Sequence, residues 1–289
     1  PRTRTTSAAA MLAGVGRRTQ EVERSLLRCF LLGHSTRKVA DALLPILGET
    51  VSAQTVSNLA RSLDAHVDGF HRRRLTGKYR TLLFDGVVIK QRTGMGSKKY
   101  CVLVALGIRP DGKKEIIDWR LAKSESELDW TNFLTDLQER GLSGEGVELI
   151  GIDGGKGMHA GLEIVYPKIP RQRCWAHKMR NLTDKAKKKD RGRVKRAAQA
   201  IYLAPTRREA LRAAGRFRRR FEHSYPDIVR CLQTDIEELL TFFLFDDPEW
   251  RKATRTTNAI ERRFVEVRRR TRPMGVFSDR TSIDRILYA

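Results

Sequence analysis

Apolar residues recur at helical spacing through the first quarter of the chain, after an opening segment, residues 1–20, that shows no apolar period. The apolar positions of the first two predicted helices are Leu26, Leu27, Phe30, Leu31, Val39, Leu43 and Leu44. Ser52 begins a third predicted helix, which runs on through Val67. Residues 21–76 are therefore predicted to form a helical module, and residues 1–20 a flexible basic arm.

The third predicted helix opens with polar side chains, in the order Gln54–Thr55–Val56–Ser57–Asn58. In a helix-turn-helix module, the recognition helix presents its N-terminal residues to the major groove of DNA. The pattern is typical of such a DNA-binding module. A small helical bundle used for oligomerisation is the open alternative.

From Tyr79 the pattern changes from helices to strands. Three consecutive strands are predicted at Arg80–Gln91, Lys99–Ile108 and Lys114–Leu121. A helix with apolar positions between Leu128 and Leu137 follows, and Gly141 ends it. The next predicted elements are an apolar strand at Val147–Ile152, a helix at Met158–Val165 and a strand at Ile169–Trp175.

This order of strands and helices predicts an α/β fold with a ribonuclease H-like mixed sheet. The first three strands form an antiparallel meander, and the crossover helix brings the fourth strand parallel beside the first. We place the first part of this core at residues 77–177. After Trp175 the chain turns helical and strongly basic, and the last clear helical pattern is Thr257–Arg270.

The net charge of the chain indicates what kind of partner it binds. A formal net charge of +23 at pH 7 destabilises a compact state through self-repulsion unless a polyanion neutralises it. Nucleic acid is therefore the leading partner, although ribosomal and membrane-surface proteins share this balance.

The four cysteines lie far apart and form neither a disulfide framework nor a paired zinc pattern, which fits a reducing cytoplasm. No apolar run reaches the roughly 18 residues that cross a bilayer, so we expect no membrane partner. The predicted location is the cytoplasm, on the bacterial nucleoid. The chain opens at Pro1 without methionine and ends in a helical pattern at Thr281–Ala289, so we expect an incomplete sequence.

Two aspartates occupy strand positions where apolar side chains are expected. Asp85 follows Leu82–Leu83–Phe84, and Asp153 follows Leu149–Ile150–Gly151–Ile152; each precedes a glycine. In the predicted topology these strands are neighbours, and two close carboxylates repel each other unless a cation lies between them. Hard oxygen ligands suit Mg²⁺ or Mn²⁺. The alternative for each residue alone is an ordinary turn aspartate before glycine.

A third acid, Glu261, lies on the last predicted helix beside an apolar stripe of Ile260, Phe264 and Val267. A helix packed on the sheet through that stripe could direct Glu261 at the two aspartates. The alternative is a solvated glutamate paired with Arg262 or Arg268.

These residues resemble the Mutator-type transposases of bacterial insertion sequences. The resemblance rests on three blocks, which are Leu83–Phe84–Asp85–Gly86, Ile152–Asp153–Gly154–Gly155–Lys156–Gly157 with Gln172–Arg173–Cys174–Trp175–Ala176–His177, and Thr256–Thr257–Asn258–Ala259–Ile260–Glu261. Their order and spacing agree with that family from about residue 25 onward.

The resemblance implies that Asp85, Asp153 and Glu261 are the catalytic acids and hold two divalent metal ions, Mg²⁺ or Mn²⁺. It also implies an all-helical basic insertion at residues 178–252, with the core completed by residues 253–289. The cations expected to contact DNA phosphates are Lys178, Arg180, Lys187, Lys188, Lys189 and, by its place after the glutamate, Arg268. Cys174 and His177 match a family signature; without a second ligand pair nearby, a structural or DNA-positioning role is favoured over zinc binding.

The function that follows is a DNA transposase acting on the terminal inverted repeats of an insertion sequence. Water as nucleophile would nick the element's end, and the freed 3′-hydroxyl would then attack target DNA. The expected partners are double-stranded DNA and at least a second copy of the chain. Two alternatives stay open: an inactive transposase-derived DNA-binding protein, and a ribonuclease H-like nuclease without strand transfer.

Overall fold

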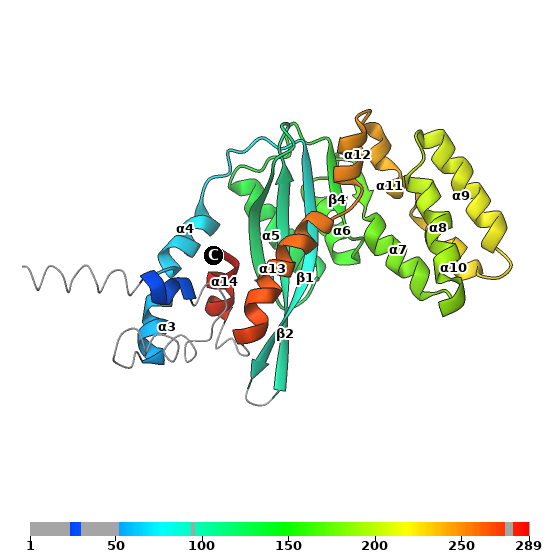
Figure 1. Ribbon diagram of the computed structural model, residues 1–289. Coiled ribbons are helices and arrows are strands. Elements are labelled where there is room, and N and C mark those ends of the chain that lie inside the picture. The colour runs from blue at the N-terminus through cyan, green and yellow to red at the C-terminus, as the bar shows by residue number, and fades with distance from the viewer. Residues whose placement is uncertain (1–23, 30–51, 94–95, 275–279, 289) are drawn as a thin grey trace, which may run out of the picture. The chain divides into compact units, whose positions relative to one another are not determined.

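The computed structural model describes residues 24–29, 52–93, 96–274 and 280–288 (Figure 1). The chain divides into two compact units. The first, here the terminal unit, consists of residues 1–72, 90–98 and 264–289. The second, the central unit, consists of residues 73–89 and 99–263. Both candidate sites described below lie in the central unit.

A five-stranded mixed sheet organises the central unit, in the order β3-β2-β1-β4-β5. Its strands are β1 (Thr81–Thr93), β2 (Gly96–Ile108), β3 (Lys114–Ala122), β4 (Leu149–Ile152) and β5 (Arg171–Arg173). β2 and β3 are antiparallel, whereas β4 is parallel to β1 on one side and to β5 on the other. The predicted parallel pairing of the first and fourth strands is therefore confirmed, and the chain has a mixed α/β fold.

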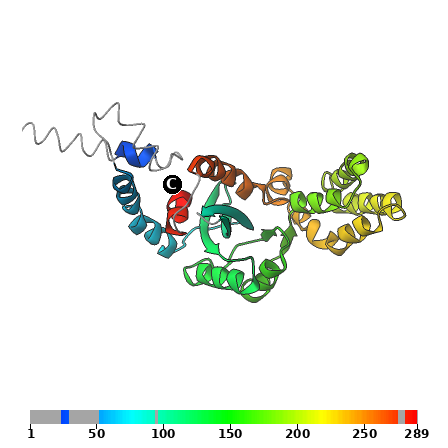
Figure 2. The ribbon, with the colours of Figure 1, turned by 90° about the horizontal axis from the view of Figure 1, so that it is seen from below.

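Helices α5 (Glu127–Glu139) and α6 (Lys156–Val165) cover one face of the sheet (Figure 2). Ser126 begins α5 by accepting the Asp129 N–H at 3.1 Å, and Gly141, with a φ of +116°, turns the chain back after it. Trp130 and Phe133 of α5 pack with Phe84 of β1 in a continuous apolar core. All four residues of β4 are buried, as its apolar sequence predicts.

The last strand is shorter than the predicted Ile169–Trp175. Pro170 has no N–H to give to a neighbouring strand. At the other end, Trp175 donates its backbone N–H to Arg255 at 3.0 Å and begins helix α7 (Trp175–Asp184) instead.

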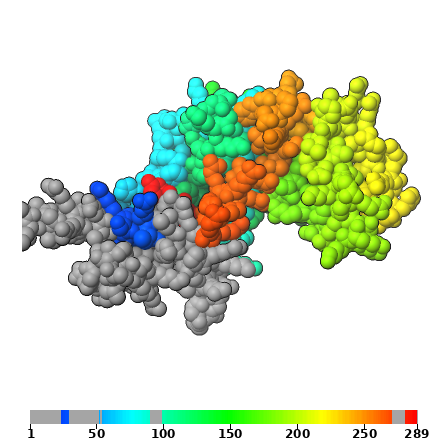
Figure 3. Space-filling model, viewed as in Figure 1, coloured from blue at the N-terminus to red at the C-terminus, as the bar shows by residue number. Residues whose placement is uncertain are grey.

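Six helices lie between β5 and the last core helix. They are α7, α8 (Arg191–Tyr202), α9 (Arg207–Phe221), α10 (Pro226–Thr234), α11 (Ile236–Leu239) and α12 (Pro248–Thr254). Of these, α7 to α11 share an apolar core of their own. On α9 the apolar residues Phe217 and Phe221 point inward, while Arg212 and Arg216 are exposed. The space-filling view shows the green and yellow helices of this group packed together into a continuous surface, with α12 in orange (Figure 3). Helix α13 (Asn258–Met274) follows α12.

In the terminal unit the third predicted helix is two helices, α3 (Ala53–Arg61) and α4 (Asp64–Arg72). Ser52 caps α3 as predicted, but the Ser62 hydroxyl donates to the Leu59 carbonyl at 2.6 Å and ends it. Helix α14 (Arg280–Tyr288) packs on α4, where Arg285 donates to Asp64 at 2.5 and 2.8 Å. The predicted basic arm and second helix lie outside the described residues. Within the described ranges, no helix has the length and apolar character that a bilayer crossing requires.

Candidate active site

Asp85 and Asp153 meet at the centre of the sheet because their strands pair in parallel. Leu83 of β1 is in register with Gly151 of β4, and each aspartate lies two residues further along its strand direction. One oxygen of each carboxylate and one ring nitrogen of His177 all lie within 4.8 Å of one another. The structure thus brings together the two aspartates that the strand pattern placed on neighbouring strands.

Asp85 is the most buried acid of this group, with 2% of its surface exposed. Burial, followed by the charge of Asp153, raises the pKa of Asp85 to about 8. A hydrogen bond from Thr257 works in the opposite direction. The Asp85 Oδ2 atom is buried and has no hydrogen-bond partner among the described residues. A buried carboxylate oxygen without a donor is an acceptor left open for a proton or a cation.

His177 lies in the first turn of α7 and faces the two aspartates. Burial, and then the charge of Arg180, lowers the pKa of His177 below its usual value, so its imidazole is neutral at pH 7. Its Nδ1 atom is buried without a hydrogen-bond partner in the described part of the chain. A neutral imidazole nitrogen so placed is a competent metal ligand, a role that the sequence pattern favours less than a structural one.

Glu261 lies at the edge of this group rather than inside it. Its carboxylate forms an ion pair with Arg180 of α7, and its Oε1 atom is 3.8 Å from Nε2 of His177. It is close enough for its charge to raise the pKa of Asp85. Of the three predicted acids, two are therefore brought together directly, and the third faces Arg180.

Buried polar contacts with Cys174, which directly follows β5, hold the start of the helix that carries Glu261 against the sheet. The Cys174 sulfur accepts the Thr257 N–H at 3.2 Å and lies 3.4 Å from the Thr257 hydroxyl. Burial raises the pKa of Cys174, so the thiol stays protonated. Cys174 therefore joins two segments that are far apart in sequence, and a structural role stays the prediction for it.

A fourth carboxylate, Glu125, is not indicated by the sequence pattern. It is half-buried between β3 and α5, and burial followed by the charge of Asp153 raises its pKa. A Cβ atom on Gly86 would lie 2.4 Å from its Oε1 atom, and one on Gly155 would lie 3.6 Å from its Oε2 atom. The glycines that follow the two aspartates thus leave room for this carboxylate. In the sequence, only these two glycines indicate that a further side chain lies here, and they do not identify Glu125 as that residue.

The cations predicted to contact DNA differ in their surroundings. Lys187, Lys188 and Lys189 are exposed near the 3₁₀ turn before α8, and Arg268 is exposed on α13. Arg180 is half-exposed and holds Glu261.

Lys178 does not fit the predicted phosphate contact. Only 2% of its side chain is exposed, and its ammonium group pairs with Asp235 and donates to the Cys231 carbonyl at 2.9 Å. The basic character of the surrounding sequence suggests a surface residue, but the face of α7 that carries Lys178 packs against α10. Lys178 is therefore an internal residue of the group of helices that follows β5.

Comparison with known proteins gives one consistent result. The family model described as "Transposase, Mutator family" matches residues 1–289. The chain is 31% identical over 278 residues to the transposase for insertion sequence element IS905 of Lactococcus lactis, covering 96% of this chain and 70% of that protein. It is 34% identical over 278 residues to the IS406 transposase of Burkholderia multivorans, covering 95% and 71%. For the IS256 transposase of transposon Tn4001 from Staphylococcus aureus, the values are 31% over 272 residues, 92% and 68%.

Proposed function

Because the chain belongs to the Mutator family of transposases, we propose that it catalyses metal-dependent phosphoryl transfer on DNA at the site of Asp85 and Asp153. The observation that carries the proposal is the pairing of these two acids on adjacent parallel strands, one of them buried with an open oxygen. The strand order β3-β2-β1-β4-β5 supports assigning the fold to the ribonuclease H-like class.

The donor set fits a divalent cation. Asp85 and Asp153 supply hard oxygen ligands, and a cation between them would remove the repulsion that, after burial, raises the pKa of Asp85. His177 adds a neutral nitrogen, which suits Mn²⁺ as well as Mg²⁺. Bound metal ions would activate the attacking oxygen of a phosphodiester exchange and stabilise the leaving oxygen.

Glu261 is assigned as the third acid of the site, held at its edge by Arg180. A DNA phosphate that attracted the exposed guanidinium of Arg180 would release the Glu261 carboxylate toward His177 and the aspartates. In this scheme Arg180 is a positioning residue. It couples arrival of the substrate to completion of the acidic group.

The substrates we assign are the terminal inverted repeats of the insertion sequence and a target DNA, joined by attack of a freed 3′-hydroxyl. Holding two ends together calls for a dimer or a larger assembly in the cytoplasm, on the nucleoid. The chain spans about 70% of the length of the relatives described above. Lys187, Lys188, Lys189 and Arg268 remain the proposed phosphate contacts outside the site.

The test uses labelled DNA taken from the two flanks of the coding sequence, a target plasmid, and Mg²⁺ or Mn²⁺. The wild type should nick the labelled end and join its 3′ end to the plasmid. Asp153→Asn should bind the same DNA equally well without nicking it. Binding without nicking by either protein would point to an inactive DNA-binding derivative, and nicking without joining to a nuclease. Equal nicking by Asp153→Asn would refute the assigned site.

A further inference from the structure

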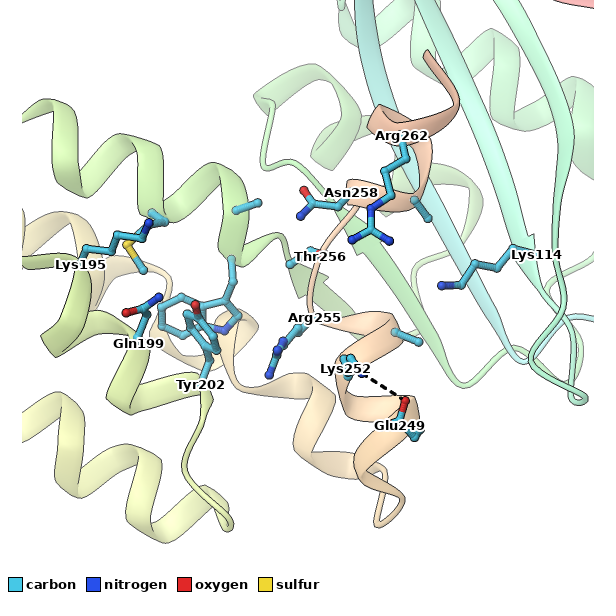
Figure 4. A pocket seen from close by; sticks show the side chains of 15 residues that line it. Lys114, Lys195, Gln199, Tyr202, Glu249, Lys252, Arg255, Thr256, Asn258 and Arg262 are labelled. Atoms are coloured by element: carbon cyan, nitrogen blue, oxygen red, sulfur yellow. Dashed lines mark hydrogen bonds and ion pairs between the residues drawn. The ribbon is translucent and has the colours of Figure 1, made fainter. Parts of the chain in front are cut away.

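A pocket of about 610 Å³ lies beside the acidic group, lined by Lys114 of β3 and by residues of α7, α8, α12, the start of α13 and the link between α12 and α13 (Figure 4). Cations dominate its lining. They are Lys114, Lys195, Lys252, Arg255 and Arg262, against a single lining acid, Glu249. The close-up shows Arg262 and Lys114 directed into the hollow from one side and Arg255 from another. A hollow with this balance of charge fits an anion.

Most of this positive charge has no partner within the described residues. Glu249 lies 3.5 Å from Lys252. No carboxylate of the described chain lies within ion-pair distance of Lys114, Arg255 or Arg262. Burial, and then the charges of Arg262 and Arg263, lower the pKa of Lys114, as expected where cations gather without an anion. A bound anion would remove this mutual repulsion.

The aromatic residues of the pocket favour contact with phosphates over contact with bases. The Arg255 guanidinium lies 4.9 Å from the centre of the Tyr202 ring. The centre of the Trp175 ring lies 5.0 Å from the same Tyr202 ring centre. Tyr202 is therefore already packed against two neighbours, and Trp175 is buried. The Tyr202 ring holds the Arg255 side chain in place by a cation–π contact, and the N–H groups of the guanidinium can donate hydrogen bonds to a phosphate.

The volume restricts the form of the ligand. Pockets of about 300 to 1,000 Å³ enclose small molecules, whereas a double helix needs an open surface or groove. One or two nucleotides of an unpaired strand fit this space. The amide side chains of Gln199 and Asn258 add hydrogen-bond donors to the lining.

The first residues of α7 and of α13 contribute to both the pocket and the acidic group. On α7, Ala176 and Met179 line the pocket, while His177 faces the aspartates. On α13, Arg262 lines the pocket, while the neighbouring Glu261 pairs with Arg180. A strand held in the pocket would therefore reach the acidic group within a short length of backbone.

We propose that this pocket binds an unpaired stretch of DNA next to the bond that reacts, through its phosphates. The proposal rests on the function proposed above and deepens it, because it assigns a site for the strand that leaves the duplex at the reacting end. Arg262 and Lys114 are the residues that touch this strand, and Arg255 is held against Tyr202 to join them.

The test compares Lys114→Gln/Arg262→Gln with the wild type by fluorescence anisotropy, without divalent metal so that no DNA is cut. The probes are a blunt duplex and the same duplex with a short single-stranded 3′ or 5′ extension. The wild type should prefer an extended duplex, and the polarity it prefers identifies the bound strand. The double variant should lose that preference. For the extended duplex, the slope of log K against log salt should become shallower by about 1.4, because each neutralised phosphate of a single strand contributes about 0.7 to that slope.

The matched control is Arg208→Gln/Arg212→Gln on the exposed face of α9, which removes the same charge outside the pocket. It should leave the preference for the extension unchanged. Unfolding curves for all proteins exclude a folding defect.

The proposal is overturned if the wild type shows no preference for either extension, if the pocket variant keeps the wild-type preference, or if both double variants weaken all probes equally. Binding and cutting are measured separately, so the two proposals can fail separately. A wild type that needs the pocket for extended DNA yet never nicks flank DNA would refute only the transposase activity.

Discussion

Replacing Asp85 by asparagine should stabilise the metal-free protein, although it removes a proposed catalytic acid. Asp85 is buried beside Asp153, and its pKa is raised from 3.8 to about 8. Because the folded-state pKa lies above the unfolded value, folding takes up a proton. The associated stability is fully present below about pH 3.8 and is lost as the pH rises toward 8.

The size of the effect follows from the same two values. At pH 7 the unfolded carboxyl is ionised, while the folded one is still largely protonated. The interval of about 3 pH units between 3.8 and 7, at about 1.36 kcal/mol each, corresponds to at most about 4 kcal/mol. Asparagine fills the same space without a titratable proton, so Asp85→Asn should avoid this loss.

Thermal unfolding without metal, from pH 5 to pH 8, measures the effect. One kcal/mol moves the Tm of a unit of this size by about 2 to 4 °C, so the variant should melt higher by up to about 15 °C at neutral pH, and by less at pH 5. Asp227→Asn, an exposed surface acid on α10, is the control and should change stability by less than about 0.5 kcal/mol. Added Mn²⁺ should stabilise the wild type more than Asp85→Asn. A variant that melts at or below the wild type at pH 8 without metal would refute the reasoning.

Three further substitutions test other contacts of the central unit. Gly86→Ala places a Cβ 2.4 Å from Glu125 Oε1, so it should displace that carboxylate and weaken Mn²⁺ binding in a calorimetric titration; Gly69→Ala, which meets nothing within 4 Å, should not. Lys178→Met removes a buried partner of Asp235, so it should lower the free energy of unfolding in urea by about 3 to 5 kcal/mol. It should leave the salt dependence of DNA binding unchanged. A shallower salt dependence would show that Lys178 contacts DNA. Arg180→Gln removes a charge that lowers the pKa of His177, so an NMR titration should find that pKa raised, and a lowered value would contradict the assigned contact.

The parts of the site that could be predicted are those marked by a local contrast. Asp85 and Asp153 each follow apolar residues that can only be buried strands, so the acids stand out, and parallel pairing of those strands brings them together. Glu125 has no such contrast, since it lies in the polar segment before α5, where acids and serines are ordinary. Only the tertiary fold, which brings the segment between β3 and α5 to Gly86 of β1, makes it part of the group.

The pattern of charged residues predicts the place of a side chain less well than the pattern of apolar residues, because it lacks such a local contrast. Lys178 and Arg180 are two residues apart on α7, yet one is buried against Asp235 and the other is half-exposed beside Glu261. In sequence both read as cations of a basic helix. What separates them is which face of α7 the insertion covers, and that depends on helices α8 to α11, which fold against it later in the chain.

The same buried contacts fix the insertion to the edge of the sheet. Asp235 receives both Lys178 of α7 and Arg173 of β5, the latter at 3.2 Å. Gln172 and Trp175 donate to the Leu239 carbonyl at 3.1 and 2.7 Å. Rotation of the helices that follow β5 about the junction of β5 and α7 would break the contacts that Arg173 and Gln172 of β5 make with them, at a cost of several kcal/mol. The spacing between α8 and the start of α13 therefore depends on polar contacts of Asp235 and Gln172, two residues that lie outside both the acidic group and the pocket lining. Substitutions at Asp235 or Gln172 should impair both sites together.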